Sequence, residues 1–276
     1  MTQSPLFAPL ASRAMIAVEG PDWRPFLQGL LTQDVEGQAC GTLRFGGLLT
    51  PQGRLLYDLF ILAKETGCWL DVAAAHRDAL IQRLTLYRLR AKVTISASPL
   101  LVSAVWKTES AEGFLSDPRL SELGLRGYGA VRPGTASEVP EAAYQAHRLT
   151  LGVPEPYADA PTDTTYPIEA NFDLLNGIDF KKGCFVGQET TSRMKRRGTI
   201  KTRMIPIHFD GPLPAFGAEI LNSDLRAGQV LSGHDGRAMA SVRLDRLQGA
   251  LTTEGRRAYI DWPTWMEPPS AGDGEP

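Results

Sequence analysis

The sequence predicts a chain of mixed helices and strands, of the α+β class, that ends in a small antiparallel β-barrel. Its 276 residues have the length of about two domains, with three small ones possible. Apolar residues recur with helical spacing over residues 76–90, among short apolar runs that suit strands. Alternating apolar residues separated by turns occupy the last third of the chain, which is typical of a barrel.

Short apolar runs bounded by turn residues predict strands at residues 14–18, 48–50, 55–62, 68–72, 92–97 and 101–106. The turn Pro51–Gly53 makes a hairpin of the second and third of these runs. A core helix is expected after Asp22, which suits an N-cap, and further helices over residues 76–90 and 141–149. Residues 110–139 are rich in Gly and Pro and predict loops around one short strand near Tyr128.

In the C-terminal part, residues 205–209 and 238–244 alternate as strands, and His234–Gly236 suits a hairpin turn. Residues 267–276 combine Pro, Gly and acidic residues and are expected to be disordered.

Composition excludes several classes of protein. A hydrophobic content of 43% and a charged content of 22% are ordinary for a globular protein, and no apolar run reaches 18 residues. The N-terminus lacks the pattern of a secretory signal. The three dispersed cysteines predict a reducing, cytoplasmic location. Zinc spacing, phosphate-binding loops and nucleophile elbows are absent from the sequence, so no metal site is predicted and an enzyme is poorly supported.

The stretch from Gly177 to Arg203 holds the cysteine best placed for chemistry. Cys184 lies between Gly183 and Gly187, which predicts a tight exposed turn, and residues 188–197 suit a short helix. The helix N-terminus and the adjacent lysines are expected to lower the thiol pKa. The alternative is an inert small residue in a turn.

Basic residues accumulate in the same stretch. Residues 181–203 contain eight Lys or Arg and one acid, a net charge of +7, so the rest of the chain carries −9. Such segregation indicates an anionic partner, and the alternative is a solvated helix face. RNA is a weaker candidate because no aromatic residues interleave with these charges.

The segment Lys182-Gly-Cys-Phe-Val-Gly-Gln-Glu189 resembles the signature Lys-Gly-Cys-Tyr-x-Gly-Gln-Glu of the YgfZ family, with Phe185 for the usual Tyr. That family comprises folate-binding proteins related to the glycine cleavage T-protein, an aminomethyltransferase, and serves iron–sulfur enzymes. The resemblance covers residues 10–262 and includes Tyr87–Val93, Arg148–Pro154 and Pro167–Asp173. Residues 152–155 and 176–180 are similar to the branch that includes the mitochondrial 4Fe–4S assembly factor.

The resemblance implies three small domains around a central cavity. The first is a ferredoxin-like folate-binding domain, discontinuous over residues 1–52 and 141–202. The second, also α+β, spans residues 53–140, and the barrel spans residues 203–266, before the tail. The cavity would hold tetrahydrofolate or a one-carbon derivative, with the pterin near Asp58 and Asn171.

Residue by residue, the resemblance gives catalytic roles to Cys184, Lys182 and Asp58. Contacts to the folate would come from Asp58, Tyr87, Arg148, Asn171, Gly183, Gly187, Gln188 and Glu189. Two departures from the T-protein pattern bear on activity. Tyr57 stands where the T-protein has the first of two acids, and Thr150 stands where its pterin-binding acid lies. An equally weighted alternative is that Asp58 points out of an edge strand.

The favoured function is that of a folate-dependent factor for the assembly or repair of iron–sulfur proteins, with Cys184 as its reactive thiol. Its expected partners are folate and iron–sulfur clients or assembly proteins, including those linked to tRNA modification, with no nucleic acid and no membrane. The alternative is a tetrahydrofolate-dependent one-carbon transferase, an aminomethyltransferase or demethylase. The retained Asp58 supports this alternative.

Overall fold

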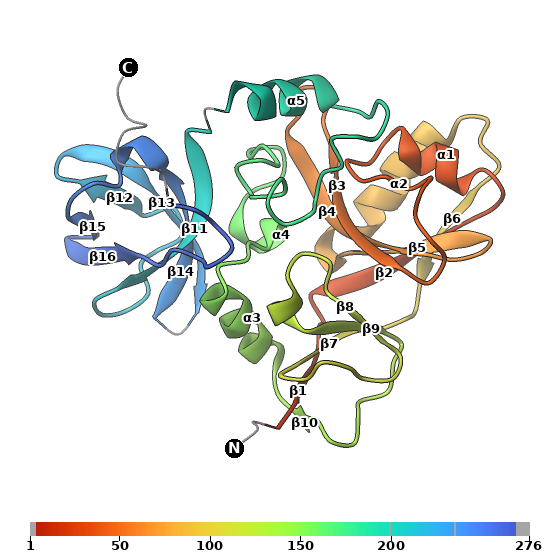
Figure 1. The fold of residues 1–276 in the computed structure, drawn as a ribbon, viewed down its shortest axis with the longest axis horizontal. Coiled ribbons are helices and arrows are strands. Elements are labelled where there is room, and N and C mark those ends of the chain that lie inside the picture. The colour runs from red at the N-terminus through yellow and green to blue at the C-terminus, as the bar shows by residue number, and fades with distance from the viewer. Residues whose placement is uncertain (1–3, 199, 235, 269–276) are drawn as a thin grey trace.

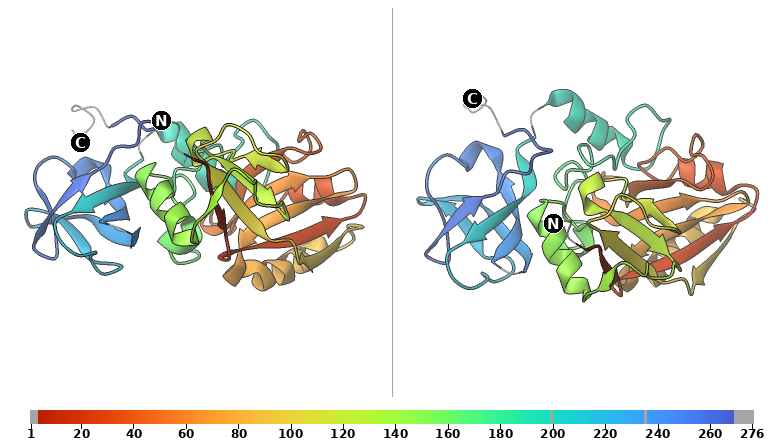
Figure 2. Two further views of the ribbon diagram at one scale, coloured as in Figure 1. Left: turned by 90° about the horizontal axis from the view of Figure 1, so that it is seen from below. Right: turned by 60° about the horizontal axis from the view of Figure 1, so that its bottom comes forward.

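The computed structural model describes residues 4–198, 200–234 and 236–268. These residues form two five-stranded sheets and a closed six-stranded barrel. The barrel lies at one end of the molecule, the larger sheet with its helices at the other, and helix α5 (Gln188–Arg197) along an edge between them (Figures 1 and 2). The expected α+β class with a C-terminal antiparallel barrel is confirmed.

The larger sheet has a ferredoxin-like arrangement, built from residues 13–98 and not from the residues 1–52 and 141–202 to which the resemblance assigns it. Its strand order is β3 (Leu43–Leu49), β4 (Leu55–Ala63), β5 (Gly67–Ala73), β2 (Arg13–Glu19) and β6 (Thr94–Ser98). All pairings in this sheet are antiparallel. Helices α1 (Trp23–Gln28) and α2 (Arg77–Arg88) complete a β-α-β-β-α-β unit, to which β3 adds an edge strand. Both helices pack on one face of the sheet through Leu27, Leu80 and Leu84.

Strand alternation decides what the opposite face carries. In β4, Leu59 and Ile61 face the helices, so Asp58 and Phe60 point the other way. In β5, Leu70 and Val72 face the helices, and Asp71 points away in the same manner. Acidic side chains therefore lie on the face that the rest of the chain covers.

The second sheet has the order β10-β1-β7-β9-β8, with strands Ser137–Glu138, Leu6–Pro9, Val102–Trp106, Leu125–Tyr128 and Phe114–Ser116. Only β1 and β10 pair in parallel. Short 3-10 turns occur at Ala74–His76, Ser121–Leu123 and Leu244–Arg246. Trp106 and Tyr144 pack edge-on in a core that also reaches Met15 of the first sheet, which joins the two sheets.

Helices α3 (Glu141–Thr150) and α4 (Pro156–Asp159) lead from the sheets to α5 and the barrel. The barrel closes in the order β11-β14-β13-β12-β15-β16, with strands Thr202–Phe209, Arg237–Arg243, Leu225–His234, Glu219–Asn222, Leu251–Thr253 and Arg256–Ile260. A shared apolar core of Phe45, Phe60, Phe172, Met204 and Met239 connects the barrel to the first sheet. Among the described residues, no helix is long and apolar enough to cross a membrane.

Several local predictions need correction. The core helix expected after Asp22 is short: α1 ends at Gln28, and Leu31 beyond it makes a bridge to Leu48. Asp22 does not cap α1 with its side chain, whose carboxylate accepts the amide of Lys92. The strands β1, β8 and β10 are not in the sequence-based assignment, because they are short and lie among turn residues.

The expected domain boundaries stay predictions, and the hairpin of β3 and β4 straddles the one placed at residue 52. Asp235 of the expected hairpin turn and residues 269–276 of the expected tail lie outside the described residues.

Candidate functional site

Cys184 lies on the surface, in the loop before α5, and its thiol is free. The other two cysteines differ from it. Cys40 is also exposed but belongs to a loop before β3, and Cys68 is buried in β5, where burial raises the pKa of its thiol. The expected exposed turn at Cys184 is therefore present, and the two glycines beside it have different roles.

Gly187 is required by packing. It takes a left-handed conformation (φ +79°) at the N-cap of α5, and a Cβ there would lie 2.6 Å from the carbonyl oxygen of Thr50. Gly53 is placed reciprocally, since its Cβ would lie 3.1 Å from the carbonyl oxygen of Gly187. This pair seats α5 on the turn between β3 and β4. A Cβ at Gly183, by contrast, would meet nothing within 4 Å.

Lys182 anchors the loop from inside. Its Nζ donates hydrogen bonds to the carbonyl oxygens of Gln28 (2.7 Å), Leu31 (2.6 Å) and Gln33 (2.8 Å). All three ammonium donors are thereby used at the C-terminal end of α1, where a cation is favoured. Burial lowers the pKa of Lys182 to about 8. The side chain expected to assist Cys184 thus holds the loop in place.

Residues 28–33 also bind the loop through other groups. The Oγ1 of Thr32 donates to the carbonyl oxygen of Gly177 (2.6 Å), and the Gln33 amide donates to that of Asn176 (2.7 Å). The amide of Val186 donates to the carbonyl oxygen of Gly29 (3.1 Å). Residues 28–33 therefore do more than complete a core helix: they hold the chain at residues before Cys184 and at a residue after it.

The basic residues of the stretch divide into two groups. Arg203 is buried and forms an ion pair with Asp173 (2.9 Å), and Lys195 pairs with the same carboxylate (3.3 Å) from the surface. Arg193 and Arg196 are exposed on α5. Part of the +7 charge of residues 181–203 is therefore paired with an acid inside the protein, and other basic side chains face solvent. Gln188 begins α5, and Glu189 in its first turn is exposed.

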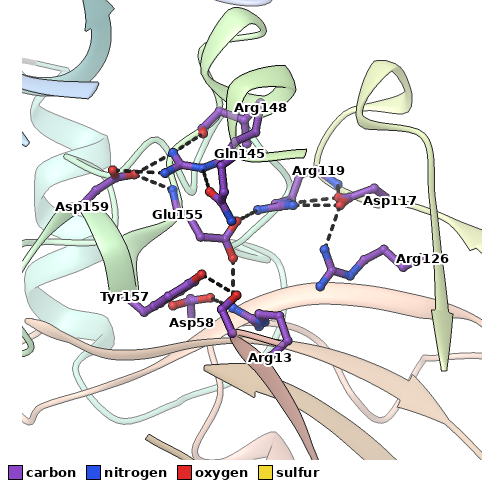
Figure 3. Close-up of polar contacts among 12 residues, drawn as sticks. Arg13, Asp58, Asp117, Arg119, Arg126, Gln145, Arg148, Glu155, Tyr157 and Asp159 are labelled. Atoms are coloured by element: carbon purple, nitrogen blue, oxygen red, sulfur yellow. Dashed lines mark hydrogen bonds and ion pairs between the residues drawn. The ribbon is translucent and has the colours of Figure 1, made fainter. Parts of the chain in front are cut away.

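The centre of the molecule holds a network of buried guanidinium and carboxylate groups (Figure 3). Arg13 in β2 binds Asp71 (2.7 Å), Asp58 (2.8 Å) and Glu155 (3.0 Å), and each of these side chains is at most 3% exposed. The second oxygen of Glu155 accepts from Arg119 (3.0 Å). Glu155 thus joins an arginine of the larger sheet to one from the loop before β9.

Arg119 and one further arginine, Arg126, extend the network. Arg126 of β9 binds Asp71 (2.6 Å), and Arg119 binds Asp117 (2.8 Å). The guanidinium carbons of Arg13, Arg119 and Arg126 lie 5.5, 4.8 and 4.0 Å from the ring centroid of Phe60, which places their charges over its face. Every carboxylate in this group has an arginine partner, as buried charges require.

The charges control how Glu155 titrates. Burial alone would raise its pKa, but the attraction of Arg119 and Arg13 outweighs burial and holds the pKa at about 2. Asp159, whose carboxylate accepts the amide of Glu155 (2.6 Å), has its pKa raised by burial. Glu155 is therefore ionised at neutral pH.

Four of the residues expected to bind folate lie apart from the cysteine loop, and three of these four already have bonded partners. Asp58 is paired with Arg13, and Arg148 with Asp159 (3.1 Å). Asn171 is fully buried, where its amide donates to the carbonyl oxygen of Met204 (2.6 Å) and accepts from Arg203 (3.1 Å). Tyr87 packs from α2 in the other core, on the helix face of the sheet. The alternative that Asp58 points into solvent is wrong, because it is 3% exposed.

A small cavity does reach Asp58, lined also by His76, Tyr157, residues 160–162 and Thr165. Its volume of about 10 Å³ is that of a single water molecule, far below the several hundred Å³ of a drug-sized ligand site. The residues as arranged do not fit a folate. Among the described residues, no group of three or more His, Cys, Asp or Glu side chains is placed to hold a metal ion.

Sequence reasoning missed most of the buried network. Asp71 interrupts the apolar run of residues 68–72, which is the same signal that singled out Asp58, whereas Arg13 stands before an apolar run and Arg126 between Leu125 and Gly127. Arg119 and Glu155 lie in loops, where charged residues carry no such signal.

Replacing Gly187 with alanine should lower the free energy of unfolding by about 2 kcal/mol or more, because the φ angle and the contact with Thr50 both oppose a Cβ. Gly183→Ala is the matched control and should change it by about 0.5 kcal/mol or less. Urea denaturation measures both. Equal losses would contradict the assignment of Gly187 to packing.

Lys182→Met should destabilise the fold by about 2 kcal/mol, because three buried carbonyl oxygens lose a charged donor. The exposed neighbour provides the control, since Lys181→Met removes the same charge and none of these bonds. A thermal midpoint unchanged by Lys182→Met would show that the anchor is dispensable.

Glu155→Gln should lower the free energy of unfolding by about 3–5 kcal/mol at pH 7, because it unbalances two buried arginines. A lowered pKa stabilises above the ordinary value of 4.5 and loses that effect as pH falls toward 2. The gap between wild type and variant should therefore narrow from pH 4.5 to 2 in denaturation curves. A gap that stays constant would contradict the ion pairing, and exposed Glu189→Gln should show no gap.

Comparison with known proteins adds the family. The model of the CAF17 C-terminal beta-barrel domain matches residues 201–268, the barrel and the residues next to it. The human mitochondrial iron-sulfur cluster assembly factor IBA57 is 30% identical, over 92% of this chain and 85% of its own. A homologue from Phaeosphaeria nodorum is 35% identical over 73% of this chain and 55% of its own.

The fold has a solved counterpart in the glycine cleavage system aminomethyltransferase T of Bartonella henselae. The TM-score is 0.76, at 18% identity, over 96% of this chain and 87% of that one. The T-protein-like fold that the resemblance implies is thereby confirmed. The chain belongs to the family of the IBA57 iron–sulfur cluster assembly factors, a branch of the YgfZ family.

Proposed function

We propose that this protein assists the assembly of iron–sulfur proteins and that Cys184 is the thiol through which it acts. The observation that carries the proposal is the exposed, free Cys184 on a loop that Lys182, Thr32 and Gly187 hold in one position. Relatives that share the family are named as iron–sulfur cluster assembly factors. A fixed, accessible thiol is what transfer or repair of a cluster requires.

The chain has too few thiols to hold a cluster by itself. Iron–sulfur clusters are held by about four cysteine ligands, and the cysteines here are three, of which Cys68 is buried and Cys40 lies on another loop. A cluster at Cys184 would therefore take its remaining ligands from an assembly or client protein. Iron–sulfur proteins are accordingly the proposed partners, and a link to tRNA modification would run through such clients.

The geometry gives less support to one-carbon transfer. A carboxylate acting near the folate N5 must reach the substrate, and Asp58 is bound to Arg13 beneath a water-sized cavity. Asp58→Asn would remove a partner of a buried arginine, so loss of activity in that variant would report unfolding as much as chemistry.

Folate binding stays a prediction, supported by the T-protein-like fold and opposed by the occupied side chains. Binding at Asp58 would require residues 156–165, which cover the cavity, to move away. Calorimetry with mono- and triglutamyl tetrahydrofolate tests this, and heats equal to those of dilution would exclude a folate site. The free state of all three cysteines fits a reducing compartment, and a cytoplasmic location remains a prediction beside relatives named as mitochondrial.

In cells that lack this protein, Cys184→Ala should fail to restore the activity of a 4Fe–4S enzyme such as aconitase, because the variant loses only the exposed thiol. Its thermal midpoint should match the wild type within about 2 °C, as expected for a surface substitution. Cys40→Ala removes the other exposed thiol and should restore activity fully. Full restoration by Cys184→Ala would refute the proposed function.

A further inference from the structure

The outer side of α5 and the loop before it form one basic surface with an exposed aromatic ring. We call it the α5 surface and define it by Phe180, Lys181, Arg193, Lys195 and Arg196, all of which are exposed. The Nζ of Lys195 lies 5.6 Å from the centroid of the Phe180 ring, so the helix and the loop present a continuous patch. Cys184 lies on the same loop.

Several charges of the α5 surface lie together without an acidic partner among the described residues. Some arginines elsewhere are paired with acids, as Arg243 is with Asp245 (2.7 Å) and Arg226 with Glu219 (3.4 Å). Within the described part of the chain, the side chains of Lys181 and Arg193 have no acidic partner. The only acid within α5 is Glu189. A surplus of positive charge on a protein whose net charge is −2 therefore concentrates beside the thiol.

We propose that the α5 surface docks an acidic face of the protein that brings the other thiolates to Cys184. This inference rests on the proposed function. Carboxylates on the partner would meet Lys181, Arg193 and Arg196, and an apolar recess would receive Phe180, which is 37% exposed.

A protein fits this surface better than a nucleic acid does. A single exposed ring cannot provide the row of stacking platforms by which single strands are bound, and α5 itself carries no aromatic residue. Nucleic acids also lack thiolates to share with Cys184.

The test uses thiol–disulfide exchange at Cys184. The probe is the symmetric disulfide of a short peptide in which glutamates flank one cysteine, and its counterpart carries lysines instead. The thiolate of Cys184 attacks one sulfur, forms the protein–peptide disulfide and releases the other peptide as a thiolate. We expect the acidic probe to react about tenfold faster than the basic one at low ionic strength, an advantage that salt should abolish. Equal rates would overturn the proposal.

Charge reversal sharpens the result. Arg193→Glu combined with Arg196→Glu should invert the preference, so that the basic probe reacts faster, which a merely unfolded variant would not do. Arg90→Glu combined with Arg257→Glu reverses two exposed charges elsewhere and should keep the wild-type preference.

A competition experiment compares oligouridylate and polyglutamate of the same total charge as inhibitors of the reaction of Cys184 with the acidic probe. Slower reaction of Cys184 in oligouridylate than in polyglutamate would assign the surface to nucleic acid and overturn the proposal.

The same variants in the deletion strain separate the two proposals. The reversed pair Arg193→Glu and Arg196→Glu should lose most of the iron–sulfur enzyme activity at an unchanged thermal midpoint. Full activity of this pair, with none for Cys184→Ala, would reject the docking surface and leave the proposed function standing. Full activity of Cys184→Ala would reject the function itself.

Discussion

The carboxylate of Glu155 is the point on which the placement of the two sheets depends. One of its oxygens accepts from Arg13 of the larger sheet and the other from Arg119, next to the second sheet. Buried guanidinium groups need carboxylate partners, so a shift of either arginine would break an ion pair to the carboxylate that both share. Asp71 repeats the arrangement with Arg13 and Arg126. Ionic contacts, in addition to apolar packing, therefore fix the interior.

This interior leaves its polar side chains little capacity for a ligand. Asp58, Arg148 and Asn171, which the family resemblance assigns to folate, are all bonded to neighbouring side chains or carbonyl oxygens. The exposed cysteine loop is the opposite case: its backbone is fixed from below by Lys182, and its thiol remains free. The polar side chains of the core are thus engaged within the protein, whereas the thiol on the surface is free to react. A free surface thiol suits an assembly factor.

Local patterns predicted much of the fold and part of the site. Strand alternation and turn residues located most strands of the larger sheet and several of the barrel, because these signals lie within a few residues, whereas the ferredoxin-like arrangement came from the family resemblance. The short motif at Cys184 was recognised for the same reason. The ion pair of Asp58 with Arg13 was not, and neither was the rest of the buried network, since Glu155 and Arg119 come from loops distant in sequence and only the folded chain brings them to Arg13. The role of Gly187 likewise depends on Gly53, which lies far from it in the sequence.

The central claim is that this fold presents one thiol for chemistry. Alkylation of the native protein by iodoacetamide, followed by mass spectrometry of peptides containing Cys40, Cys68 and Cys184, tests it most directly. The account predicts that Cys184 reacts fastest, and that buried Cys68 reacts only on unfolding. Faster labelling of Cys40 than of Cys184 in the folded protein would contradict it.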